Sequence, residues 1–212
     1  MTLSTAAAGP CSAWGGALIL SATLLPARSF AQPSGGKSRI GIIGSGHIGG
    51  TIGGLWVKAR HPVMFSSRHP DELKDMVAGR DNAAALKGKV VLDACNATAA
   101  RDGAIAEEVE RDGIGVTSQK YLAGTRLVRG FNTMSYMTFA KEANRPDPRL
   151  AIPIAGDDAE AVQIVSGLVR DAGFDPVVVG KLADAKRFQR GGPGYGQPVS
   201  AAELKQKLNL AP

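Results

Sequence analysis

The segment 39–50 constrains the fold of this chain more than any other part of the sequence. It runs from the apolar stretch 40–43 through the pattern Gly44-x-Gly46-x-x-Gly49 into apolar positions at helical spacing. Glycines at this spacing have separate uses: the first allows a tight turn, the second admits a pyrophosphate near the backbone, and the third lets the helix pack on the strand. The pattern therefore predicts a strand, a turn and a helix that bind a dinucleotide. The expected contacts are Gly44, Ser45, Gly46, His47, Ile48 and Gly49. The imidazole of His47 either covers the pyrophosphate or packs at the start of the helix.

Composition narrows the kind of partner. The chain has 212 residues, enough for one domain with a complete core, and its net charge of +6 is spread over segments of mixed sign. This distribution favours a small anionic ligand over nucleic acid. Cys11 and Cys95 are the two cysteines, and their spacing indicates neither a metal site nor a disulfide framework. Cys95 ends an apolar stretch and is interpreted as a small buried side chain rather than a nucleophile.

Residues 1–37 differ in character from the rest of the chain. No charged residue precedes Arg28, the run 13–25 is mostly apolar, and Ser29-Phe30-Ala31 resembles a small-residue cleavage site. These features predict a signal-like leader and linker, an exported protein, and no stable membrane span in the mature form. Because no Lys or Arg precedes the apolar run, a cytoplasmic location is the alternative.

Downstream of the first helix, strand-like and helix-like patterns alternate. Strands are expected at 63–66, 89–94, 127–131, 150–155 and 177–179, and helices at 70–79, 104–109, 134–142, from 157 onward and after Ser200, with 113–124 mostly loop. This order predicts an α/β fold with a doubly wound, mostly parallel sheet over 38–190, followed by a Gly/Pro-rich tail with a short terminal helix over 191–212. Within 187–196, Arg187 and Arg190 either close over an acidic acceptor or belong to a solvated tail, and the solvated tail is favoured.

The end of the second expected strand indicates the cofactor. In such folds a carboxylate at this point favours the free 2'-hydroxyl of the adenosine ribose, whereas arginine accommodates a 2'-phosphate. Here the residues are Ser67, Arg68 and His69, and arginine offers a planar set of donors to anionic oxygens. The sequence therefore predicts NADP(H), with a solvated turn as the alternative role of Arg68.

Several blocks of sequence, in this order, resemble one family. They are 40–49, Ser67-Arg68, 90–96, 127–133, 152–158, 173–176 and 180–184. With these residues the chain, over about 38–190, resembles the NADPH-dependent reductases of the deazaflavin coenzyme F-420 and the related soluble reductase domains of membrane metalloreductases. The resemblance implies a Rossmann-type NAD(P)-binding fold, hydride transfer between NADP(H) and a flavin-like, deazaflavin or ferric acceptor, and a homodimer.

The resemblance also implies where the nicotinamide or the acceptor would lie. Asn96, Asn132 and Thr133 would face it, although Asn132 could equally tie down its own loop. No side chain is assigned as catalytic and none as a metal ligand, because direct hydride transfer mainly requires the two rings to be held together and water to be excluded.

One stretch departs from the pattern of that family. Only nine residues, 80–88, separate the helix expected to end at Gly79 from the strand expected at 89–94. The family has a strand, a helix and a further strand there, including the strand beside the glycine-motif strand. Either the strand at 89–94 pairs with the first strand, or the sheet has a gap. The alternative to an oxidoreductase is therefore a non-catalytic NADP-binding domain, degenerate or shortened.

Overall fold

The computed structural model describes residues 36–44, 46–65 and 86–211. The predicted leader, Ser45, the helix expected at 70–79 and the NADP-selecting residues Ser67, Arg68 and His69 lie outside the described residues. The described elements are β1 (Ile40–Ile42), α1 (His47–Lys58), β2 (Val63–Phe65), β3 (Val90–Asp93), α4 (Ala99–Asp102), α5 (Ala104–Asp112), α6 (Ile114–Tyr121), β4 (Arg126–Arg129), α7 (Tyr136–Glu142), β5 (Ala151–Gly156), α8 (Ala159–Asp171), β6 (Asp175–Gly180), the 3-10 helix η2 (Leu182–Arg187) and α9 (Ala201–Lys207). Within those ranges, no helix is both long and apolar enough to cross a membrane.

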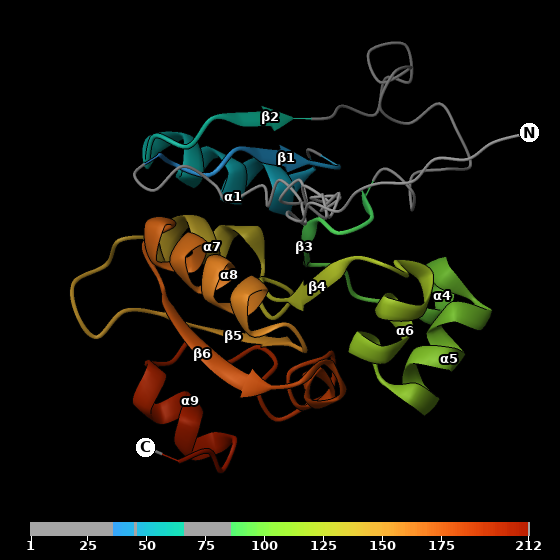
Figure 1. Ribbon diagram of the computed structural model, residues 1–212. Coiled ribbons are helices and arrows are strands. Elements are labelled where there is room, and N and C mark those ends of the chain that lie inside the picture. The colour runs from blue at the N-terminus through green and yellow to red at the C-terminus, as the bar shows by residue number, and fades with distance from the viewer. Residues whose placement is uncertain (1–35, 45, 66–85, 212) are drawn as a thin grey trace, which may run out of the picture. The chain divides into compact units, whose positions relative to one another are not determined.

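The strands form two sheets (Figure 1). Strand β1 pairs with β2 in parallel, and the second sheet has the order β3-β4-β5-β6. In this second sheet β3–β4 and β5–β6 are parallel, and β4–β5 is antiparallel. The predicted α/β fold with a mostly parallel sheet is confirmed.

Among the described residues the strands fall into two separate sheets, which agrees with the gap that the short 80–88 segment allowed as one of two outcomes. Among the described residues, β3 pairs with β4 and β1 pairs with β2, and no ladder joins β1 to β3. All four residues of β3 are half-buried, whereas those of β5 from Ala151 to Ala155 are fully buried. Among the described strands β3 thus lies at the edge of its sheet, although its apolar sequence is typical of an interior strand.

Side-chain hydrogen bonds connect α1 and the residues that follow it to α8. The indole Nε1 of Trp56 on α1 donates a hydrogen bond of 2.8 Å to the Leu168 carbonyl. The buried ring of His61 lies 2.9 Å from the Asp171 carboxylate through Nε2 and 3.1 Å from the Ser38 carbonyl through Nδ1. The contacts with Leu168 and Asp171 span more than 100 residues of sequence, so only the folded chain brings these residues together.

Helices cover both faces of the four-stranded sheet. Along β5, Ile152 and Ile154 enter an apolar cluster with residues of α1, α7 and α8. Ala151 and Ala155 point the opposite way, into a cluster with residues of α5, η2 and α9. This alternation follows from the two-residue period of a strand, and it produces two cores on one sheet.

Two helices begin at a residue whose side chain caps them. The Asp158 side chain accepts a hydrogen bond of 2.8 Å from the Ala161 N–H and caps α8. At α9, the Ser200 hydroxyl and the Glu203 carboxylate form the reciprocal capping box that the sequence predicts. Both motifs are local, which explains why they can be identified from sequence.

The prediction of a loop over 113–124 is wrong, because residues Ile114–Tyr121 form α6. A Cβ on Gly115 would lie 2.1 Å from the Leu182 carbonyl oxygen, so glycine permits α6 to approach η2 closely. The first turn is also fixed from a distance, since the Ile114 N–H donates to Gln189 Oε1 at 2.9 Å. Tertiary packing therefore overrides a weak local helix signal.

The favoured interpretation of 187–196 as a solvated tail is also wrong. Phe188 is completely buried in the cluster under α9, and Gly194 is buried against it. The Gly196 N–H donates to the Thr133 carbonyl at 2.9 Å. The segment is thus packed beside the loop that follows β4.

Candidate functional site

The glycine turn has the geometry that its spacing predicts. Gly44 adopts a φ of +87°, a left-handed conformation that favours glycine. A Cβ on Gly49 would lie 2.3 Å from the Gly44 carbonyl oxygen, so only glycine allows α1 to start this close to the turn. Gly46 is exposed, and a Cβ there would meet no other described heavy atom within 4 Å. The start of α1 is therefore open to a ligand at the point where helix N–H groups attract anions.

The ring of His47 stacks on Tyr136 of α7. The ring centroids are 4.4 Å apart and the planes differ by 15°. His47 thus packs at the helix start, which was one of its two expected roles, while Ile48 packs against the first apolar cluster. Because Tyr136 follows Thr133 by three residues, the stack places the glycine turn beside the loop that follows β4.

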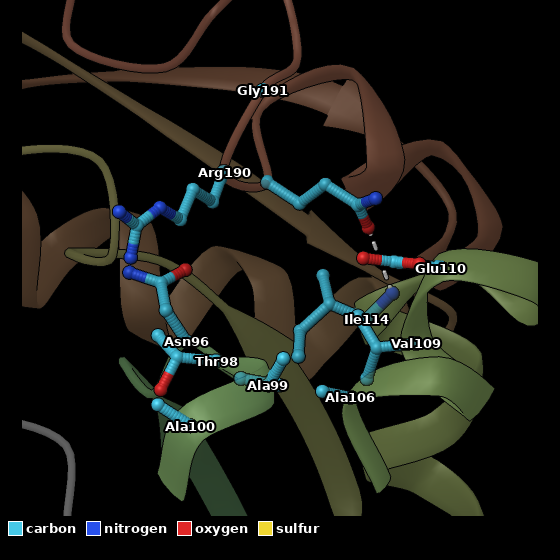
Figure 2. Close-up of a pocket in the computed structure, with 12 residues that line it drawn as sticks. Asn96, Thr98, Ala99, Ala100, Ala106, Val109, Glu110, Ile114, Arg190 and Gly191 are labelled. Atoms are coloured by element: carbon cyan, nitrogen blue, oxygen red, sulfur yellow. Dashed lines mark hydrogen bonds between the residues drawn. The ribbon is translucent and has the colours of Figure 1, made fainter. Parts of the chain in front are cut away.

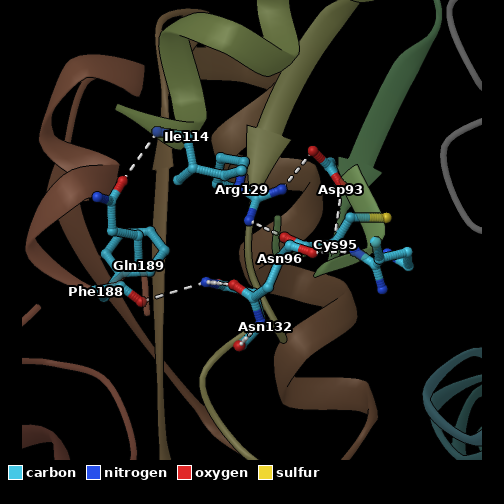
Figure 3. A network of polar contacts seen from close by, with 9 residues as sticks. Asp93, Cys95, Asn96, Ile114, Arg129, Asn132, Phe188 and Gln189 are labelled. Atoms are coloured by element: carbon cyan, nitrogen blue, oxygen red, sulfur yellow. Dashed lines mark hydrogen bonds and ion pairs between the residues drawn. The ribbon is translucent and has the colours of Figure 1, made fainter. Parts of the chain in front are cut away.

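Asn96 and Asn132 meet at the carboxyl ends of β3 and β4 (Figure 3). The Asn96 amide donates to the Asn132 carbonyl at 2.6 Å, and Asn132 Nδ2 lies 3.3 Å from Asn96 Oδ1. Asn132 Nδ2 also donates to the Phe188 carbonyl at 3.2 Å. The amide nitrogen of Asn132 therefore ties the loop to the segment after η2.

Two buried oxygens beside this junction lack a partner. Asn132 Oδ1 and Thr133 Oγ1 make no hydrogen bond with any described residue, although their side chains are almost completely buried. Buried polar atoms are normally hydrogen-bonded, and leaving one without a partner costs about 1–3 kcal/mol. These atoms are suited to the donors and acceptors of a ligand such as a carboxamide.

A buried ion pair supports the loop after β3. The Arg129 guanidinium, which is completely buried, pairs with the Asp93 carboxylate and donates to the Cys95 carbonyl (Figure 3). Burial by itself would raise the pKa of Asp93. The charge of Arg129 and hydrogen bonds from the Cys95 N–H and from Ser118 outweigh burial and hold this pKa below 3.8. This ion pair was not predicted from the sequence, although a charged residue, Arg129, in the otherwise apolar strand expected at 127–131 was a signal for it.

Cys95 is exposed, so its interpretation as a buried filler is wrong. Cys95 lies two residues beyond the end of β3. Loss of water around the thiol and the neighbouring Asp93 carboxylate raise its pKa to about 11. The thiol is therefore protonated at neutral pH and is a poor nucleophile despite its exposure.

This environment predicts slow alkylation of Cys95. In a Cys11→Ser variant, the rate with iodoacetamide should rise about tenfold for each unit of pH between 7 and 10, because only the thiolate reacts. Mass spectrometry of the peptide that contains Cys95, over a range of pH, measures this rate. A plateau already near pH 9, as for an ordinary cysteine, would contradict the raised pKa.

Asn96 also lines a cavity of about 510 Å³ (Figure 2). Its other lining residues come from the segment 97–100, from α5, from the start of α6 and from the segment after η2; they are Ala97, Thr98, Ala99, Ala100, Ala106, Val109, Glu110, Ile114, Gln189, Arg190 and Gly191. Among these residues, Asn96, Arg190 and Gly191 were candidates for a ligand site from the sequence. Four separate segments of the chain form the cavity wall, so no local sequence pattern could have identified the cavity.

Comparison with known proteins supports the fold. No protein-family model matches the chain. A hypothetical protein from Sinorhizobium meliloti is 22% identical, with a TM-score of 0.60 over 77% of this chain and 95% of its own. A protein from Arthrobacter sp. FB24, provisionally described as an F420-dependent NADP reductase, is 17% identical, with a TM-score of 0.54 over 70% of this chain and 87% of its own. The chain therefore has a Rossmann-like α/β fold similar to that of this NADP reductase.

A sequence relative is also found in Escherichia coli (strain K12). The protein YjhV is 43% identical over 63 residues, which are 30% of this chain. The match spans 46% of YjhV, less than half of that relative's length.

Proposed function

We propose that this chain is an NADP(H)-dependent oxidoreductase that transfers hydride between NADP(H) and a flavin-like or deazaflavin acceptor. The observation that carries the proposal is the glycine turn, which presents the open start of α1 beside the loop of Asn132 and Thr133. The fold likeness to a reductase and the family resemblance of the sequence blocks support it.

Each part of the site has a separate role in this proposal. The N–H groups at the start of α1 bind the pyrophosphate, and Gly46 leaves room for it. Asn132 Oδ1 and Thr133 Oγ1 hold the carboxamide and orient the ring, because both lack hydrogen-bond partners among the described residues. When bound, the nicotinamide supplies the hydride. The chain has to position two rings and exclude water, which can lower a barrier by about 7–11 kcal/mol through orientation alone.

The alternative is an NADP-binding domain without catalysis. The gap between β1 and β3 favours it, because the missing ladder lies between the glycine turn and the loop of Asn96. In that case the phosphate-binding half of the site functions without the half that holds the rings.

A two-stage titration separates the proposals. The purified protein is titrated with NADPH and with NADH, and F-420, FMN or a ferric chelate is then added while NADPH oxidation is followed. We expect tighter binding of NADPH and oxidation with at least one acceptor. Binding without turnover would support the non-catalytic alternative, and absence of NADPH binding would exclude both.

Replacement of Arg68 by alanine should remove the preference for NADPH. We expect about 10- to 100-fold weaker NADPH binding and unchanged NADH binding, because a charge-assisted hydrogen bond contributes about 1.5–3 kcal/mol. Calorimetric titration measures both affinities. Arg111→Ala is the matched control, since Arg111 is exposed and pairs with its neighbour Asp112. An NADPH affinity that survives in Arg68→Ala would refute the phosphate role.

A further inference from the structure

The cavity that begins at Asn96 extends from the proposed nicotinamide site. Asn96 lines the cavity and its amide donates to the Asn132 carbonyl, so the two spaces share a wall. Both lie beyond the carboxyl ends of β3 and β4, where ligands of open α/β sheets bind. A second substrate in the cavity would therefore lie next to a nicotinamide held by Asn132 and Thr133.

One end of the cavity carries an unpaired positive charge. The exposed side chain of Arg190 points toward Asn96 at one end of the cavity (Figure 2). Among the described residues Arg190 has no ion-pair partner, whereas Arg101 and Arg129 pair with Asp102 and Asp93. Arg190 is thus free to bind an anion from solution.

The backbone that carries Arg190 is fixed on both sides of the cavity. The preceding residue, Gln189, accepts a hydrogen bond from the Ile114 N–H through Oε1 at 2.9 Å. Phe188 is completely buried, and its carbonyl accepts from Asn132 Nδ2. The arginine is therefore held at the cavity even though its side chain is exposed.

The remaining wall suits a flat ring. Ala99, Ala100, Ala106 and Val109 are small apolar residues, and they leave a volume of about 510 Å³. Pockets for organic ligands have volumes of about 300–1,000 Å³ and combine apolar walls with a few polar groups. The one carboxylate of the wall, Glu110, lies at the end away from Arg190, near Ile114 (Figure 2). An anion is therefore attracted to the end formed by Arg190 and Asn96.

We propose that the cavity binds the electron acceptor, and that this acceptor combines a flat redox ring with an anionic side chain held by Arg190. The inference rests on the proposed function and specifies its acceptor. For a flavin, a hydride passes from nicotinamide C4 to flavin N5 and a proton from solvent is added at N1, giving NADP⁺ and the reduced flavin. The anion is a phosphate or a carboxylate, since guanidinium binds both in the same bidentate way.

FMN and riboflavin provide a direct test, because they share one ring system and differ in the phosphate. Flavin fluorescence measures the affinity without NADPH, and anaerobic loss of flavin absorbance after NADPH addition measures transfer. We expect FMN to bind at least about tenfold more tightly than riboflavin, which corresponds to one charge-assisted contact. A flavin whose side chain ends in a carboxylate, compared with FMN, shows which anion is preferred.

Variants of Arg190 assign the effect to this residue. Arg190→Gln should make FMN bind as weakly as riboflavin and leave riboflavin affinity unchanged, while Arg190→Lys should retain part of the preference. Arg187→Gln is the matched control, because Arg187 lies in the same segment but does not line the cavity. Circular dichroism verifies that each variant is folded.

The outcomes distinguish this inference from the proposed function. Arg190-dependent FMN binding without NADPH oxidation would support the cavity and refute the oxidoreductase. NADPH oxidation at equal rates with FMN and with riboflavin would support the oxidoreductase and refute the role of Arg190 in binding the acceptor. The inference is also overturned if neither flavin binds, or if Arg190→Gln keeps the preference for FMN.

Discussion

A Gly49→Ala variant should bind NADPH about 10- to 100-fold more weakly than the wild-type protein. The new Cβ would lie 2.3 Å from the Gly44 carbonyl oxygen and 3.0 Å from Ile42, so the turn or the helix has to move. Displacement of one or two helix N–H groups from the pyrophosphate removes contacts of about 1.5–3 kcal/mol each. Overpacking should also lower the free energy of unfolding by about 1–3 kcal/mol.

Gly54→Ala is the control for this prediction. Gly54 lies in the same helix, and a Cβ there would meet no other described heavy atom within 4 Å. Alanine in a helix interior is favoured over glycine by about 0.5–1 kcal/mol, so this variant should be slightly more stable and should bind NADPH normally. Calorimetric titration and urea unfolding measure both quantities. A folded Gly49→Ala protein with wild-type NADPH affinity would contradict the role of the turn.

An Arg129→Met variant should lose about 3–5 kcal/mol of unfolding free energy. Arg129 is completely buried and Asp93 is almost so, and methionine would leave the carboxylate buried without its partner. Arg126→Ala, on the same strand, removes a half-exposed partner of Asp158 and Glu160 and should cost at most about 1 kcal/mol. Equal losses in the two variants, measured by urea unfolding, would contradict the importance of the buried pair.

The loss caused by Arg129→Met should depend on pH. Because the folded-state pKa of Asp93 lies below 3.8, the ion pair contributes its full stability above that value. The contribution disappears as the pH falls through the lower folded-state pKa, since a protonated Asp93 no longer needs the guanidinium. The difference in unfolding free energy between the wild type and Arg129→Met should therefore be largest at neutral pH and should narrow as the pH falls through the lowered folded-state pKa of Asp93. Asp93→Asn combined with Arg129→Met should recover part of the stability at neutral pH.

Local sequence patterns predicted the elements that depend on nearby residues. The glycine turn, the helix expected from 157 onward and the helix expected after Ser200 all begin at motifs whose residues lie within about one helical turn of each other. Predictions failed at α6, at Cys95 and in the segment around Phe188. Helix α6 depends on packing against η2, Phe188 is buried under α9, and Cys95 is exposed in the loop that follows β3.

The candidate site likewise has one part that the sequence predicted and other parts that only the folded chain forms. Spacing alone identified the glycine turn, because a tight turn and a close helix approach restrict which residue types can occupy those positions. The meeting of Asn96 with Asn132, the stack of His47 on Tyr136 and the cavity under Arg190 depend on contacts between distant segments. The sequence by itself determined the α/β class and the phosphate-binding turn, since both rest on local backbone geometry. Tertiary structure alone decided that the sheet is divided and that a cavity forms beside Asn96, because long-range packing selects which strand edges pair and which walls meet.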